Sequence, residues 1–161
     1  MEKALVFDKD RCTGCRLCET ICSLVHTETC NPERSRIRIM EVQQGGVEIR
    51  LCCQQCEDPF CMAACPVSAI HKNPFTGAIE IDHELCTKCE ECLTACPYQA
   101  ISLDRVEDKV INCDLCGGDP RCIVFCQTRA IEFVEKDSVV IQKKRDALRE
   151  LEGLLKLAEK Y

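Results

Sequence analysis

The sequence predicts an α+β fold in which short helices and β-hairpins build two small units, followed by a C-terminal amphipathic helix. Three observations support this fold class. Sixteen of the eighteen cysteines fall into four runs of four, so the 161 residues repeat one kind of unit. Segments of alternating apolar and polar residues follow the runs, as in β-hairpins. Residues 142–161 carry no cysteine and repeat leucine and alanine at steps of three and four, which is typical of an amphipathic helix.

The third cysteine run sets the pattern. It reads C-T-K-C-E-E-C-L-T-A-C-P from Cys86 to Pro97, the C-x2-C-x2-C-x3-C-P spacing of bacterial iron–sulfur ferredoxins. In that spacing three cysteines bind one [4Fe–4S] cluster and the fourth completes a different cluster, so each run needs a partner run. The other runs span 12–22, 53–65 and 113–126, and the second and fourth widen the middle gap to four and five residues. Four complete sets predict four [4Fe–4S] clusters in two bacterial 2[4Fe–4S] ferredoxin-like units.

The segments between the runs supply the other elements in order. Ala4–Phe7 is predicted as an edge strand and Cys18–His26 as a short helix. Alternating residues predict four hairpins, which pair 37–42 with 47–51, 69–71 with 78–81, 100–103 with 109–111, and 130–134 with 138–141. Arg34, Arg36 and Arg38 are expected on the polar face of the first hairpin, either as a solvated face or, less favoured, as a docking patch.

Composition excludes several other classes. The formal net charge is -6, and oxidised clusters add about -2 each, so no nucleic-acid partner is expected. A disulfide scaffold does not repeat one spacing four times, and the charged N-terminus does not resemble a signal peptide. Zinc takes its ligands as separated pairs, so a zinc-binding interaction module is a remote alternative. No segment approaches the roughly 18 apolar residues of a membrane span, and free thiols favour a cytoplasmic location.

Longer stretches of the sequence resemble a known family. The first run, C-T-G-C-R-L-C-E-T-I-C-S-L-V-H, and the later N-P-E-R-S-R-I-R-I resemble the polyferredoxin subunits beside carbon monoxide dehydrogenase and tungsten aldehyde oxidoreductases. The order of the runs, with C-E-D-P-F-C at 56–61, is similar to the iron–sulfur subunits of DMSO-reductase-type complexes, and C-D-L-C at 113–116 fits as well. The resemblance covers residues 1–141.

The resemblance implies a domain organisation and a pairing of the runs. Runs one and four form an outer unit (1–46 and 104–141), runs two and three an inner unit (47–103), and 142–161 is the C-terminal helix. The implied ligand sets are Cys12, Cys15, Cys18 and Cys126 for cluster 1, Cys113, Cys116, Cys122 and Cys22 for cluster 2, Cys53, Cys56, Cys61 and Cys96 for cluster 3, and Cys86, Cys89, Cys92 and Cys65 for cluster 4.

The remaining candidate ligands are assigned other roles. Cys53 is chosen over Cys52 because it keeps the two-residue spacing to Cys56. Cys30 matches no ligand position and is expected to be a buried free thiol. The three histidines are expected at the surface or in loops rather than as ligands; they are His26, His71 and His83.

These features predict a non-catalytic electron-transfer subunit. A cluster with four thiolates has no open position for substrate, and the sequence contains no nucleophile–base pattern or dinucleotide motif. The favoured partner is a catalytic subunit with tungsten or molybdenum, an aldehyde oxidoreductase, together with a redox acceptor or donor protein. The alternatives are a freely diffusing polyferredoxin, or a subunit of a carbon monoxide dehydrogenase, hydrogenase or ring-reducing complex. The C-terminal helix is expected to dock a partner rather than pack on the body.

Overall fold

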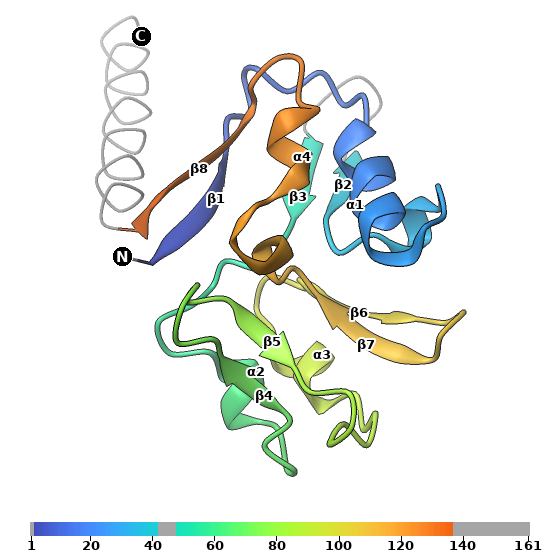
Figure 1. Cartoon of the computed structure of the whole chain (residues 1–161), viewed down its shortest axis with the longest axis vertical. Helices are drawn as coiled ribbons and strands as arrows, with labels where there is room; N and C mark the ends of the chain where they lie inside the picture. The colour runs from blue at the N-terminus through green and yellow to red at the C-terminus, as the bar shows by residue number, and fades with distance from the viewer. Residues whose placement is uncertain (1, 42–47, 137–161) are drawn as a thin grey trace, which may run out of the picture.

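The computed structural model describes residues 2–41 and 48–136 (Figure 1). The predicted C-terminal helix, the strand predicted at 138–141 and most of the first hairpin's turn lie outside these residues. In chain order the described elements are β1 (Lys3–Phe7), α1 (Leu17–Thr27), η1 (Pro32–Arg34), β2 (Arg38–Glu41), β3 (Glu48–Leu51), α2 (Phe60–Ala63), β4 (Ile70–Lys72), β5 (Ile79–Ile81), α3 (Glu91–Ala95), β6 (Ile101–Asp104), β7 (Lys109–Asn112), η2 (Leu115–Gly118), α4 (Arg121–Val124) and β8 (Ile131–Glu135). None of the helices among them is long and apolar enough to cross a membrane.

Three of the predicted hairpins are confirmed. β2 pairs with β3, β4 with β5, and β6 with β7, each as a two-stranded antiparallel sheet. The predicted short helix at Cys18–His26 is α1, which begins one residue earlier and ends one residue later. The fold is therefore built from small helices and strands, as the alternating segments predicted.

The partner of the strand predicted at 130–134 was not predicted. β8 pairs antiparallel with β1, with Lys3 opposite Glu135 and Phe7 opposite Ile131. The backbone N–H of Asp8 extends this contact by donating to the carbonyl of Ala130 at 2.8 Å. Turn residues after 134 favour a hairpin with the next segment of the chain. The pairing of β8 with β1 instead joins the two ends of the described chain, and no local sequence pattern indicates a contact over that distance. The beginning and the end of the described chain therefore lie side by side (Figure 1).

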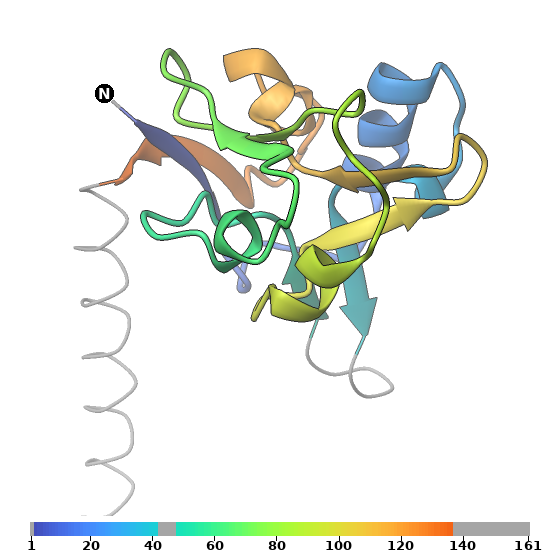
Figure 2. The same cartoon turned by 90° about the horizontal axis from the view of Figure 1, so that it is seen from below.

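Buried apolar residues gather in two groups, which we call the outer core and the inner core. Figure 1 shows the corresponding elements as two neighbouring halves of the molecule, and Figure 2 shows the lower half from below, in front of the other. The outer core consists of Leu5, Cys22, Ile37, Cys52, Ala78, Cys113, Leu115, Cys122 and Ile131. The inner core consists of Cys61, Ile70, Ile79, Cys92, Ile101 and Val110. Cys53 packs against both cores, so the second cysteine run begins where they meet.

Arg34 does not lie on a solvated strand face as expected. It lies in η1, its side chain is only 8% exposed, and its Nε is 2.8 Å from Oδ2 of Asp104 in β6. A second ion pair joins it to Glu107 in the turn after β6. Arg36 also has a carboxylate partner, Asp114 of the fourth run. Two of the three arginines thus connect the first half of the chain to the β6–β7 hairpin and the run that follows it.

Candidate iron–sulfur cluster sites

The four cysteine runs share one backbone bend. The third residue of the first C-x-x-C segment in each run has a positive φ: 67° at Gly14, 50° at Gln55, 58° at Lys88 and 58° at Leu115. A non-glycine residue in this left-handed region costs roughly 1 kcal/mol, and three of the four positions accept that cost. The runs are therefore repeats in backbone geometry as well as in spacing.

A second bend recurs after the last cysteine of runs two, three and four. Ser68, Gln99 and Arg129 each stand three residues after that cysteine and have φ values of 53°, 48° and 52°. The next backbone N–H then donates to the cysteine sulfur at 3.2 Å, from Ala69 to Cys65 and from Ala130 to Cys126. Backbone donors stabilise negative charge on a sulfur, which is the form that binds iron.

Run one reaches a similar result by another route. Its fourth cysteine, Cys22, lies inside the eleven-residue helix α1, so no such bend follows it. The N–H of Arg36, from the loop before β2, donates to Cys22 Sγ at 3.4 Å. A distant segment thus supplies the donor that a local turn supplies in the other runs.

Two cavities are each lined by four cysteines from two different runs. One is lined by Cys12, Cys15 and Cys18 of run one together with Cys126 of run four. The other is lined by Cys86, Cys89 and Cys92 of run three together with Cys65 of run two. Apolar residues complete both walls, among them Phe7 and Ile131 in the first and Ile70 and Val110 in the second.

Several of the remaining eight cysteines lie close enough to one another to raise each other's pKa. Burial raises the pKa of Cys22 to about 11, and the neighbouring Cys113 and Cys116 add to the rise. Burial also raises the pKa of Cys122, with contributions from the sulfurs of Cys113, Cys22 and Cys116. Burial and then Cys96 and Cys56 raise the pKa of Cys61. Burial raises the pKa of Cys53 to about 12, and the neighbouring Cys113 and Cys61 add to the rise, so Cys53 lies between the two groups.

The donor set fits iron–sulfur clusters. No disulfide joins any of the eighteen cysteines, although eight of them line two cavities in groups of four. Burial raises the pKa of the Cys18 thiol to about 12 and that of Cys92 to about 11, so these groups stay protonated unless a metal ion takes the place of the proton. Four such sets are consistent with four [4Fe–4S] clusters, which four thiolates each would hold.

Cys65 and Cys126 differ from the buried thiols. Burial raises the pKa of each, but hydrogen bonds outweigh it, from backbone N–H groups in Cys65 and from Thr128 and backbone N–H groups in Cys126. The pKa of each thiol consequently lies below its ordinary value. In each cavity three cysteines come from one run and the fourth, Cys65 or Cys126, comes from another. This fourth cysteine is the one whose lowered pKa favours the thiolate.

The two cysteines outside the runs behave differently from each other. Cys30 is exposed, so the expectation of a buried thiol there was wrong; it follows α1 in a polar loop where nothing covers it. Cys52 is 1% exposed and lies in the outer core beside Cys113. A hydrogen bond between the two thiols is the main cause of a raised pKa for Cys52 and a lowered pKa for Cys113.

His26 departs from the expected surface position, whereas His71 and His83 are exposed as expected. His26 lies on α1, and its Nε2 is 3.6 Å from Cys116 Sγ and 3.6 Å from Asp114 Oδ1. Burial is the main cause of a lowered pKa for His26, and Arg36 lowers it further. The four-residue step from Cys22 to His26 places both on one helix face, and this spacing is a signal that the sequence carried.

A buried polar network was missed by the sequence analysis. Gln55, 1% exposed, donates from Nε2 to the carbonyl of Cys113 and accepts from the N–H of Ile79, both at 2.7 Å. Asn112 donates to the carbonyl of Ile79 at 2.7 Å. The network joins run two, strand β5 and run four at the meeting point of the two cores. Gln54 and Gln55 both stand between Cys53 and Cys56, and the sequence carries no pattern that shows which of the two is buried.

Cysteines from separate runs that surround shared apolar cavities define an iron–sulfur protein of the ferredoxin type. Residues 49–136 match the model of the 4Fe-4S dicluster domain, and the chain belongs to this family. It is 40% identical over 122 residues to the aliphatic sulfonate oxidoreductase, polyferredoxin-like subunit, of Pyrococcus furiosus, which covers 76% of this chain and 70% of that protein.

Two further relatives extend the similarity. The B subunit of the anaerobic dimethyl sulfoxide reductase of Escherichia coli is 33% identical, over 78% of this chain and 70% of its own length. NADH-dependent phenylglyoxylate dehydrogenase subunit beta of Aromatoleum evansii is 36% identical over 81% of this chain, which spans 30% of that protein. The chain is thus an iron–sulfur electron-transfer protein related to subunits of oxidoreductase complexes, and it is not itself catalytic.

Proposed function

We propose that this chain holds four [4Fe–4S] clusters and relays single electrons between a catalytic oxidoreductase subunit and a separate redox protein. The proposed ligands are Cys12, Cys15, Cys18 and Cys126; Cys113, Cys116, Cys122 and Cys22; Cys53, Cys56, Cys61 and Cys96; and Cys86, Cys89, Cys92 and Cys65. The observation that carries the proposal is that two cavities are each lined by three cysteines of one run and the last cysteine of another. When bound, such a cluster gains or loses one electron at a time.

The protein's own residues have three tasks in this function. The thiolates hold the iron, and backbone N–H groups such as that of Ala130 stabilise charge on the sulfur. Apolar residues keep water from the cavities, which also affects the reduction potential. Cys53 packs against both cores, so the step between the outer and inner pairs of clusters is proposed to run through this junction.

The proposed catalytic partner is a tungsten or molybdenum enzyme, with an aldehyde oxidoreductase favoured. The first-run sequence C-T-G-C-R-L-C-E-T-I-C-S-L-V-H supports this choice through its resemblance to the polyferredoxin subunits of such enzymes. An aliphatic sulfonate oxidoreductase is a second candidate, supported by the 40% identity to the subunit with that name. The proposed outer and inner units are those of the sequence analysis, and the proposed location is the cytoplasm, where eighteen unpaired cysteines stay reduced.

Two measurements test the proposal. Iron, acid-labile sulfide and zinc are determined per chain on the anaerobically purified protein, and about sixteen iron and sixteen sulfide are expected. Zinc with little sulfide would contradict the cluster assignment. The tagged full-length chain is then purified anaerobically from the cells that encode it. An oxidoreductase subunit containing tungsten or molybdenum should accompany it; a chain that purifies alone would instead be a freely diffusing polyferredoxin.

A further inference from the structure

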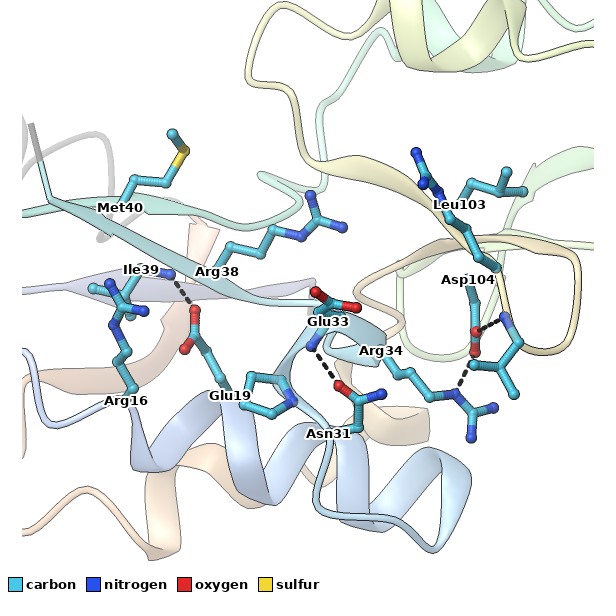
Figure 3. A pocket seen from close by; sticks show the side chains of 13 residues that line it. Arg16, Glu19, Asn31, Glu33, Arg34, Arg38, Ile39, Met40, Leu103 and Asp104 are labelled. Carbon is cyan, nitrogen blue, oxygen red and sulfur yellow. Dashed lines mark hydrogen bonds and ion pairs between the residues drawn. The ribbon is translucent and has the colours of Figure 1, made fainter.

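A pocket of about 560 Å³ lies between η1 and β2 on one side and the β6–β7 hairpin on the other. Figure 3 shows Arg16 and Glu19 of the first run, Arg38 of β2, and Asp104 at the end of β6 around it. Its lining includes exposed apolar side chains as well, since Met40 is 51% and Val106 is 69% exposed. A pocket of this size and mixed chemistry is large enough to receive side chains of another molecule.

The pocket carries a small net positive charge. Four arginines line it against three carboxylates, those of Glu19, Glu33 and Asp104, and Arg34 is already bound by Asp104 and Glu107. Within residues 2–41 and 48–136, no ion pair joins the other three to a carboxylate; they are Arg16, Arg38 and Arg105. The chain as a whole has a formal net charge of -6, to which the clusters add, so this pocket contrasts with the rest of the protein.

The pocket wall also contains a buried carboxylate. Glu19 is 5% exposed, and its Oε1 accepts the N–H of Ile39 at 2.6 Å. Its Oε2 is buried and has no hydrogen-bond partner among the described residues, so an occupant of the pocket does not reach it. A polypeptide can supply carboxylates for the arginines and apolar side chains for Met40 and Val106. An inorganic anion could satisfy only the arginines.

The pocket adjoins a proposed cluster site. Arg16 and Ile39 line both this pocket and the cavity of Cys12, Cys15, Cys18 and Cys126. Arg16 directly follows Cys15, which is exposed. An occupant of the pocket would therefore contact residues that also wall a cluster cavity, which brings it close to that proposed cluster. The chain's own residues 142–161 are a poor occupant, because they carry six Lys or Arg against four Asp or Glu.

We propose that this pocket is a docking site for an acidic segment of the catalytic oxidoreductase subunit, with Arg16, Arg38 and Arg105 binding its carboxylates. The inference rests on the proposed function, which supplies the partner. Charge complementarity orients an acidic partner that the rest of this surface repels, so the pocket determines the face on which the complex forms.

The test measures the affinity between the separated chain and the oxidoreductase subunit that accompanies it from cells. Arg38→Glu and Arg105→Glu are each expected to raise Kd by at least about tenfold, because they set like charges against each other in the complex. Arg105→Lys retains the charge and should stay within about threefold of the wild type. Arg121→Glu makes the same charge change at an exposed position in α4, outside the pocket, and should leave Kd within about twofold.

Iron and sulfide contents confirm that each variant still holds its clusters. An unchanged Kd in both pocket variants would overturn the proposal while leaving the proposed function intact. The proposal would also be overturned if the variants abolish self-association of the chain. It would be overturned as well if citrate binds the wild type in this pocket and the oxidoreductase subunit does not compete with it. Absence of any accompanying oxidoreductase subunit would overturn the proposed function, and this inference with it.

Discussion

Arg34 and Asp104 form a buried ion pair across seventy residues of sequence, with 2.8 Å between Nε and Oδ2. The side chains are 8% and 4% exposed, and Asp104 also accepts the N–H of Val106 at 2.9 Å. Glu107 binds the same guanidinium, so Arg34 forms two ion pairs with residues at the β6–β7 turn. This contact anchors the segment after α1 to the hairpin of the other half.

The ion pair predicts how stability depends on pH. Burial raises the pKa of Asp104, but Arg34 and the N–H groups of Val106 and Glu107 outweigh it, so the pKa of Asp104 lies below its usual value. The stabilisation is then complete above the unfolded pKa of about 3.9 and is lost as pH falls through the lower folded pKa. Asp104→Asn should lower the apparent urea midpoint by the same amount at every pH from about 5 to 8. A difference that shrinks within this range would contradict the lowered pKa.

Gln55 predicts a loss of stability at the junction of the two cores. Gln55→Leu leaves the N–H of Ile79 without a partner, at a cost of about 1–3 kcal/mol, and leaves the carbonyl of Cys113 with only Asn112 Nδ2 at 3.3 Å. Gln54→Leu is a matched control, since Gln54 bonds only to the nearby carbonyl of Cys52. Urea unfolding under anaerobic conditions, monitored by the loss of visible cluster absorption, gives the urea midpoints of the two variants. Equal midpoints would show that the buried amide contributes nothing.

The proposed pairing of runs predicts which substitutions act alike. Cys126→Ser and Cys15→Ser should each remove about four of the sixteen iron atoms, and the double variant should lose no more than either single variant. Cys65→Ser combined with Cys15→Ser should lose about eight, because those residues line different cavities. Iron analysis and low-temperature EPR of the reduced protein distinguish these outcomes. Additive losses for Cys126 and Cys15 would place them in separate clusters.

Substitutions of Cys52 and Cys53 are expected to have different effects on the iron content. Cys53→Ala should lower the iron content by about four, whereas Cys52→Ala should leave it at about sixteen. Cys52→Ala should instead lower the reduction potential of the cluster bound by Cys113, because it removes the hydrogen bond between the two sulfurs. A redox titration followed by EPR measures this shift. Loss of iron from Cys52→Ala, with Cys53→Ala unaffected, would reverse the ligand assignment.

The repeated backbone bends predict a stabilising substitution. Gln99 has a φ of 48°, so Gln99→Gly should relieve roughly 1 kcal/mol of strain. Gln127 is also exposed but is not among the positive-φ residues, so Gln127→Gly should be destabilising by about 0.5–1 kcal/mol. Thermal unfolding of both variants provides the comparison, and a lower Tm for Gln99→Gly than for Gln127→Gly would refute the prediction.

Features with a local signal were predicted well from the sequence. The cysteine runs, the helix at Leu17–Thr27 and three hairpins each follow from spacing or alternation over a few residues. The family also follows from the runs alone, because the third run has the C-x2-C-x2-C-x3-C-P spacing of bacterial iron–sulfur ferredoxins. The resemblance grouped Cys126 with run one, and both now line one cavity.

Features that depend on distant contacts were not predicted. The pairing of β1 with β8 was missed because a turn signal at 135–137 favoured a local partner. Arg34 was assigned to a solvated face because alternation cannot reveal that Asp104 lies opposite. Cys30 and His26 were misplaced for the same reason, since the burial of a single polar residue depends on what packs against it.

The pairing of β1 with β8 has a consequence for synthesis of the chain. Residues 3–7 leave the ribosome early, yet their partner strand at 131–135 follows only after all four cysteine runs have been made. The cavity of Cys12, Cys15 and Cys18 waits equally long for Cys126. All four cysteines of the cavity of runs two and three have been made by Cys92, so a nascent chain can be loaded with iron there first. Cluster insertion is therefore expected to begin at the cavity of runs two and three. A chain that ends before Cys126 would carry metal there and not in the cavity of Cys12, Cys15 and Cys18.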